Sequence, residues 1–283
     1  MKTLSAPPSL LSLYAKAAAT SPLHRGVTLP DSVYQLEPQA VDTAHLAEYD
    51  RVCGFRFGDD LPPTYLHVLA FPLQVALMSE RAFPFPLVGL VHVANEITVR
   101  RTVTADERFA VTVRAADLRP HAAGRQFDLR SEVTVQGETV WSGRSTYLRR
   151  AGRAPAGSAA GRSPKRAPAP PEGAVSRVRV PGDIGRRYAA VSGDRNPIHL
   201  HALTAKAFGF PSAIAHGMWL KARVLATLEG RLPDAFTVQV SFKAPLLLPS
   251  TVAVTTARDG DGWSLDVRDI RSGRPHLVGT LTR

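Results

Sequence analysis

The chain has 283 residues, of which 44% are hydrophobic and 21% charged, a composition typical of a globular protein with a sizeable core. Its 35 basic and 24 acidic residues give a formal net charge of +11, but no run interleaves basic with aromatic residues, so we expect no nucleic-acid partner. The single cysteine, Cys53, excludes an intrachain disulfide and a cysteine-built metal site, and predicts a cytoplasmic location.

The first predicted element is a helix over residues 10–19. Its apolar run is interrupted by Tyr14 and Lys16, so we predict an amphipathic helix rather than a signal peptide. Nowhere does an apolar stretch approach the roughly 20 residues needed to span a bilayer. We therefore expect no membrane insertion.

The N-terminal half, residues 1–150, has one further helical pattern followed by strand-like runs. The helix is predicted at residues 71–79. The strands are predicted at residues 88–98, 109–118, 126–135 and 139–149.

Residues 151–175 are rich in Ala, Pro, Gly and Arg and predict a linker to a C-terminal domain at residues 176–283. That half repeats the order of the first. An apolar helix begins near Gly217, and strands are predicted at residues 236–244, 251–257, 263–269 and 276–282. The pattern predicts an α+β protein made of two similar domains.

The segment from Tyr188 to His199 reads YAAVSGDRNPIH and contains the candidate catalytic residues. Asp194 and His199 lie on a stretch stiffened by glycine and proline, so a carboxylate and an imidazole can converge on one bound molecule. That pair is suited to proton transfer. The alternative is a plain surface turn, since Gly-Asp and Asn-Pro are common turn dipeptides.

The chain continues to Ala215-His216-Gly217-Met218, and the whole series resembles the hydratase signature of the MaoC-like (R)-specific enoyl thioester hydratases and dehydratases. The resemblance implies a double hot-dog fold, in which two antiparallel sheets each wrap around a central helix. It implies reversible interconversion of trans-2-enoyl and (3R)-3-hydroxyacyl thioesters of coenzyme A or acyl carrier protein. It implies no metal and no organic cofactor.

The resemblance also assigns roles to residues. Asp194 and His199 form the catalytic pair. Gly217 lies where the buried helix begins, so its free N–H is the candidate donor to the thioester oxygen. Asn196 and Ser192 are expected to orient the loop, and structural roles are expected for His201 and His216.

Placing the two halves side by side sets Asp50 against Asp194, Phe55 against His199 and Pro72 against Gly217. The N-terminal half then lacks the imidazole and the N–H donor, and we expect it to be catalytically dead. Its freed loops give room for a longer acyl chain. The apolar runs 61–71 and 83–87 either line such a tunnel or pack the core, and core packing is favoured.

Two other functions are weighed. A hot-dog thioesterase is disfavoured because such enzymes usually lack the Asp-x-Asn-Pro-x-His loop. A non-catalytic acyl-thioester binding or scaffold subunit leaves the intact pair unexplained. For assembly, we expect a monomeric pseudo-dimer or a homodimer.

Overall fold

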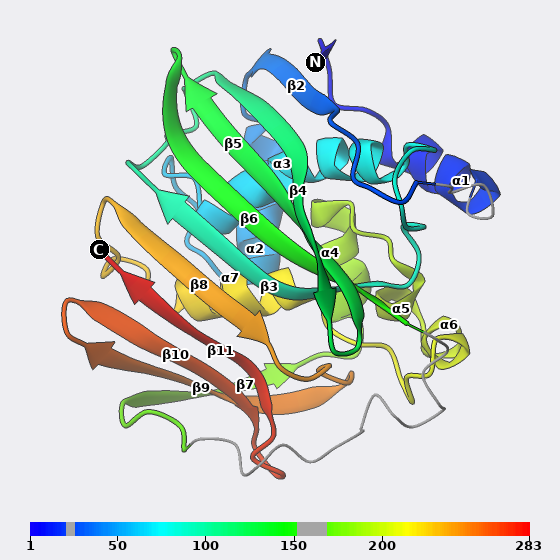
Figure 1. The fold of residues 1–283 in the computed structure, drawn as a ribbon. Helices are drawn as coiled ribbons and strands as arrows, with labels where there is room; N and C mark the ends of the chain where they lie inside the picture. Colours follow the sequence, from blue (N-terminus) through cyan, green and yellow to red (C-terminus); the bar gives the residue numbers. More distant parts are fainter. Residues whose placement is uncertain (21–25, 152–168) are drawn as a thin grey trace. The chain divides into compact units, whose positions relative to one another are not determined.

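The computed structural model describes residues 1–20, 26–151 and 169–283, which form two compact units (Figure 1). The first unit comprises Met1–Tyr49 and Phe57–Ala151. The second comprises Asp50–Arg56 together with the C-terminal part of the chain. Most of the expected linker, residues 152–168, lies outside the described residues.

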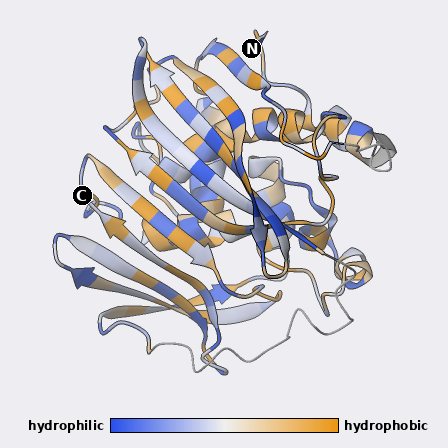
Figure 2. Ribbon diagram, viewed as in Figure 1, coloured by the Kyte–Doolittle hydropathy of each residue, from blue (hydrophilic) through white to orange (hydrophobic). Residues whose placement is uncertain are grey.

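The N-terminal unit has a sheet of strand order β1-β2-β4-β5-β6-β3. All its pairs are antiparallel except β1 with β2. Figure 2 shows hydrophobic and hydrophilic bands alternating along its long strands, as expected for a sheet with one face on a core. The elements up to residue 151 are β1 (Lys2–Leu4), α1 (Leu10–Thr20), β2 (Val33–Gln39), α2 (Thr43–Cys53), α3 (Pro63–Met78), β3 (Leu90–Val99), β4 (Phe109–His121), β5 (Gly124–Val135) and β6 (Glu138–Arg150). The end of α2, from Asp50, belongs to the second unit.

Helix α3 is the core helix of this unit and contacts β2 to β6. It begins at Pro63, well before the predicted start at residue 71, and Pro72 lies inside it. Proline suits the first position of a helix because that N–H has no intrahelical partner. Nearly every α3 side chain is buried, so most of the apolar run 61–71 belongs to a core helix.

The C-terminal unit has a sheet of order β8-β11-β10-β9-β7, antiparallel throughout. Strand β7 begins inside the expected linker. The elements are β7 (Ala174–Val180), α4 (Ile184–Ser192), α5 (Pro197–Leu200), α6 (Ala202–Ala207), α7 (Gly217–Ala226), β8 (Phe236–Phe242), β9 (Ser250–Asp259), β10 (Gly262–Asp269) and β11 (Pro275–Thr282).

The predicted α+β class is confirmed, with a largely buried helix and a mainly antiparallel sheet in each unit. The sequence patterns missed strands β1, β2 and β7 and helices α2, α4 and α5. Among the described residues, no helix combines the length and apolarity needed to cross a membrane.

The structure corrects how the two halves correspond. Helices α2 and α4 each end at a left-handed glycine, Gly54 with φ 79° and Gly193 with φ 72°. A buried tyrosine, Tyr49 or Tyr188, stands five residues before each glycine. Phe55, and not Asp50, therefore occupies the position of Asp194. The earlier match was wrong because a shared Asp-Arg dipeptide is weaker evidence than a shared helix end.

The starts of the core helices correct the second match. An isolated β-bridge lies two residues before the N-cap of each, at Asp60 for α3 and at Ile214 for α7. Pro63 therefore corresponds to Gly217, and Pro72 does not. A proline still stands where the C-terminal unit has its glycine.

Candidate active site

The loop after α4 begins with a backbone reversal at Gly193. Its N–H donates to the Ala189 carbonyl at 3.0 Å, and its φ of 72° is a conformation that favours glycine. The reversal ends α4, so Asp194 is the first residue of the loop and no longer follows the direction of the helix.

Ser192 and Asn196 hold the loop in this shape through backbone N–H groups. The Asp194 N–H donates to Ser192 Oγ at 3.2 Å, and the Asn196 N–H donates to Asp194 Oδ1 at 3.1 Å. Asn196 also caps α5, because its Oδ1 accepts from the Ile198 N–H at 3.4 Å. Both side chains make the loop contacts expected of orienting residues.

His199 lies in α5 with 9% of its surface exposed. Its Nδ1 is 2.8 Å from the Ile214 carbonyl oxygen, and a carbonyl can only accept, so Nδ1 carries the proton. The free lone pair is then on Nε2. Gly185 of α4 packs directly beneath, since a Cβ there would stand 2.0 Å from the His199 carbonyl oxygen.

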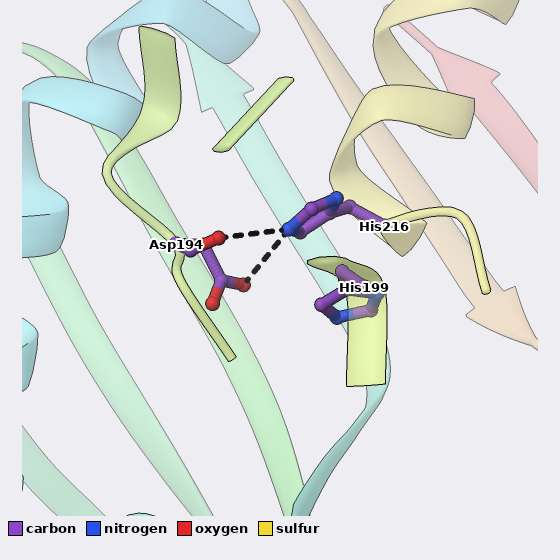
Figure 3. Close-up of side chains that lie close together, drawn as sticks. All are labelled: Asp194, His199 and His216. Carbon is purple, nitrogen blue, oxygen red and sulfur yellow. Dashed lines mark hydrogen bonds and ion pairs between the residues drawn. The ribbon is translucent and has the colours of Figure 1, made fainter. Parts of the chain in front are cut away.

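His216 brings the loop and α5 together (Figure 3). Its Nε2 lies 3.0 Å from the Asp194 backbone oxygen and 3.9 Å from Asp194 Oδ2. Its ring stacks on the His199 ring with centroids 3.7 Å apart and an interplanar angle of 26°. The sequence pattern assigned His216 only a structural role.

Gly217 is the first residue of α7, directly after the N-cap His216. The N–H of a first helical residue has no intrahelical partner and lies at the positive end of the helix dipole. A Cβ on Gly217 would stand 2.9 Å from the Phe242 ring, so only glycine fits there without displacing that ring.

Burial sets the protonation states of the two imidazoles. It lowers the pKa of His199, although the Asp194 charge and the Ile214 carbonyl oppose the shift. Burial, with a smaller contribution from His199, lowers the pKa of His216 to about 3. Both rings are therefore neutral at pH 7, and His199 is ready to accept a proton at Nε2.

Asp194, His199 and His216 each offer a ligand atom, and these atoms lie within 4.8 Å of one another. The geometry suits a metal poorly. A metal lies in the plane of each imidazole that binds it, at about 2.0–2.1 Å for zinc. Two rings stacked 3.7 Å apart and 26° from parallel do not direct their lone pairs to one such point.

Comparison with known proteins identifies the family. The model of the MaoC like domain matches residues 162–275. The chain is 38% identical to 3-hydroxyacyl-thioester dehydratase X of Mycobacterium tuberculosis over 98% of this chain and 99% of the relative. The chain belongs to the MaoC-like dehydratase family. It also shares 35% identity with an (R)-specific enoyl-CoA hydratase of Rhodospirillum rubrum, over 26% of this chain and 54% of that protein.

Solved MaoC-like structures agree. The crystal structure of HtdX from Mycobacterium tuberculosis has a TM-score of 0.78 at 37% identity, covering 88% of this chain and 99% of HtdX. A MaoC-like dehydratase structure at 17% identity has a TM-score of 0.70 over 89% of this chain and 98% of that one, and supports the fold alone. The predicted double hot-dog fold is confirmed.

The site thus gathers Asp194, His199 and the start of α7. His201 does not join it: this exposed residue caps α6, where its Nδ1 accepts from the Leu203 N–H at 3.1 Å. Sequence reasoning missed Gly185 entirely. Its Ile-Gly-Arg setting gives no signal, because the need for glycine comes from a carbonyl fourteen residues later in the chain.

Proposed function

We propose that this MaoC-like protein is an (R)-specific hydratase and dehydratase that interconverts trans-2-enoyl thioesters and (3R)-3-hydroxyacyl thioesters. The observation that carries the proposal is the Asp194–His199 pair beside the N-terminus of α7. The relatives support it, because they are named as dehydratases and hydratases of the same thioesters.

In dehydration, the pair takes one proton from C2 and delivers one proton to the 3-hydroxyl, so that it ends with the protons it began with. The hydroxyl leaves as water, and the C2–C3 double bond forms. His199 exchanges its proton at Nε2, since Nδ1 donates to the Ile214 carbonyl. Hydration runs through the same groups in reverse.

The Gly217 N–H stabilises the negative charge that develops during the reaction. Negative charge collects on the thioester oxygen when C2 loses its proton, and a helix N-terminus stabilises that charge. We place the thioester carbonyl there. In the N-terminal half of the chain, Phe55 and Pro63 take the places of Asp194 and Gly217, so we propose that this half performs no catalysis.

The proposed substrates are thioesters of either coenzyme A or acyl carrier protein, since the net charge of +11 suits either anionic carrier. A binding subunit without activity is the alternative from another class. It would leave unexplained why the loop is built so that carboxylate, imidazole and helix N-terminus converge.

The test is hydration of trans-2-enoyl-CoA thioesters of increasing chain length, followed by loss of the conjugated enoyl absorbance. We expect turnover and a 3R product. Acyl carrier protein thioesters are assayed in parallel. Binding without turnover on either carrier would favour a binding subunit, and release of the free thiol would favour a thioesterase.

A further inference from the structure

His216 touches every part of the proposed site. It donates to the backbone of Asp194, stacks on the ring of His199 and directly precedes Gly217. Only 3% of its surface is exposed. A side chain in this place can fix the distances between three groups that come from separate elements.

Helix capping does not account for this histidine. His216 is the N-cap residue of α7, yet its side chain makes no capping hydrogen bond. The usual N-cap residues are Ser, Thr, Asp and Asn, which accept from the first turn. Here the ring donates in the other direction, to the loop that carries Asp194.

The stack restricts His199 in a second way. Its bond to the Ile214 carbonyl fixes one ring edge, and the His216 ring covers one face at 3.7 Å. Together these contacts set the direction of the Nε2 lone pair. A face covered by a neutral ring is also closed to water.

The charged and titratable groups around His216 keep this arrangement free of positive charge. His199 and burial disfavour its protonation, and Asp194 only partly offsets them. Tyr188 packs against it with ring centroids 5.0 Å apart. A neutral His216 leaves His199 as the imidazole that exchanges protons.

We propose that His216 is a positioning residue that locks the Asp194 loop and the His199 ring at the separation needed for proton transfer. The expected effect on the rate rests on the proposed function. The expected effect on the Asp194 loop and the His199 ring rests on the geometry alone. Misplacement of reacting groups by about 1 Å costs on the order of 100-fold in rate.

Two variants separate the two contacts. His216→Gln keeps an N–H donor for the Asp194 carbonyl and loses the ring stack, whereas His216→Phe keeps a stacked ring and loses the donor. We expect kcat for enoyl-CoA hydration to fall about 10- to 100-fold in each, with KM changed less than about threefold. His276→Gln is the matched control: His276 is also buried, with Nδ1 bonded to the Ala244 carbonyl, but lies outside the site.

A second readout does not depend on activity. NMR titration of the His199 ring nitrogens should show the Nδ1–H tautomer and a low pKa in the wild type. In His216→Gln, where water reaches the ring, the His199 pKa should rise toward about 6.5. An unchanged titration, or kcat within twofold of wild type in both variants, would overturn the positioning role. A wild type inactive on every thioester would overturn the proposed function instead, and the titration would still decide the role of His216.

Discussion

Helix α2 in the N-terminal half of the chain and helix α4 in the C-terminal half end in the same way, and the two halves then diverge. Both halves have a buried tyrosine, a left-handed glycine five residues later, and a core helix that begins three residues after a β-bridge. Directly after the glycine, the C-terminal half has Asp194 and the N-terminal half has Phe55. At the start of the core helix, one has Gly217 and the other Pro63.

The comparison separates framework from chemistry. The left-handed glycine makes the turn in both halves, and it is present even where no carboxylate follows directly. The groups that differ are those to which we assign proton transfer and oxyanion donation. The proposal therefore assigns catalysis to one loop and one helix start, on a framework that both halves of the chain possess.

Removing the backbone N–H at the start of α7 should have the largest effect on activity. Gly217→Pro imitates the N-terminal unit, and Phe242→Leu is added to make room, because Phe242 would meet any Cβ at residue 217. Loss of an oxyanion donor should lower kcat roughly 100- to 1,000-fold. Gly217→Ala with Phe242→Leu keeps the N–H and is the control. Equal activities in the two double variants would remove Gly217 from the mechanism.

Gly185 tests how closely α4 must approach His199. In Gly185→Ala the new methyl group would stand 2.0 Å from the His199 carbonyl oxygen, so α5 must shift. We expect kcat to fall about 10- to 100-fold with a smaller change in KM. Gly182→Ala is the control, since its Cβ would meet only a Pro249 atom at 3.9 Å. Full activity in Gly185→Ala would show that the approach is not required.

The pH profile tests the neutral state of His199. Burial lowers the pKa of His199, so protonation inactivates the base only below pH 6.5. We expect the acid limb of kcat/KM to lie below pH 6.5 and to be lost in His199→Gln, whatever activity remains. An acid limb centred at or above pH 6.5 would contradict the buried, neutral ring.

The smallest effect that we predict comes from replacing Asp50, and it is an effect on the stability of the fold. It is 1% exposed, and neither carboxylate oxygen has a hydrogen-bond partner among the described residues. Burial and the nearby Glu229 charge raise its pKa to about 7. The folded state therefore binds a proton that the unfolded state has lost, and stability falls as pH rises from about 4 through 7.

Asp50→Asn removes this ionisation. We compare the free energy of unfolding of the variant with that of the wild type at each pH. This difference should be about 2 kcal/mol more favourable to the variant at pH 8 than at pH 5. Asp266→Asn is the contrast, because Asp266 is a buried carboxylate paired with Arg268 at 2.7 Å and its replacement should destabilise at pH 8. Chemical denaturation at the two pH values measures both. A pH-independent difference for Asp50→Asn would show that the residue stays ionised.

The sequence predicts those parts of the site that lie close together in the chain. Asp194, Asn196 and His199 share one loop, so a local pattern can identify them. The roles of Gly185 and His216 depend on contacts with residues fourteen and twenty-two positions away, and no local pattern encodes them. The false match of Asp50 has the same cause, since helix ends are set by backbone conformation and not by a shared dipeptide.

The most direct test of a single catalytic loop is hydration of trans-2-enoyl-CoA by Asp194→Asn and His199→Gln, beside Asp183→Asn and His201→Gln. The control residues are exposed, and neither belongs to the proposed site. We predict losses of about 100- to 10,000-fold in the first two proteins, with near wild-type rates in the controls. Activity within a fewfold of wild type in both Asp194→Asn and His199→Gln would contradict the account and place the chemistry elsewhere in the chain.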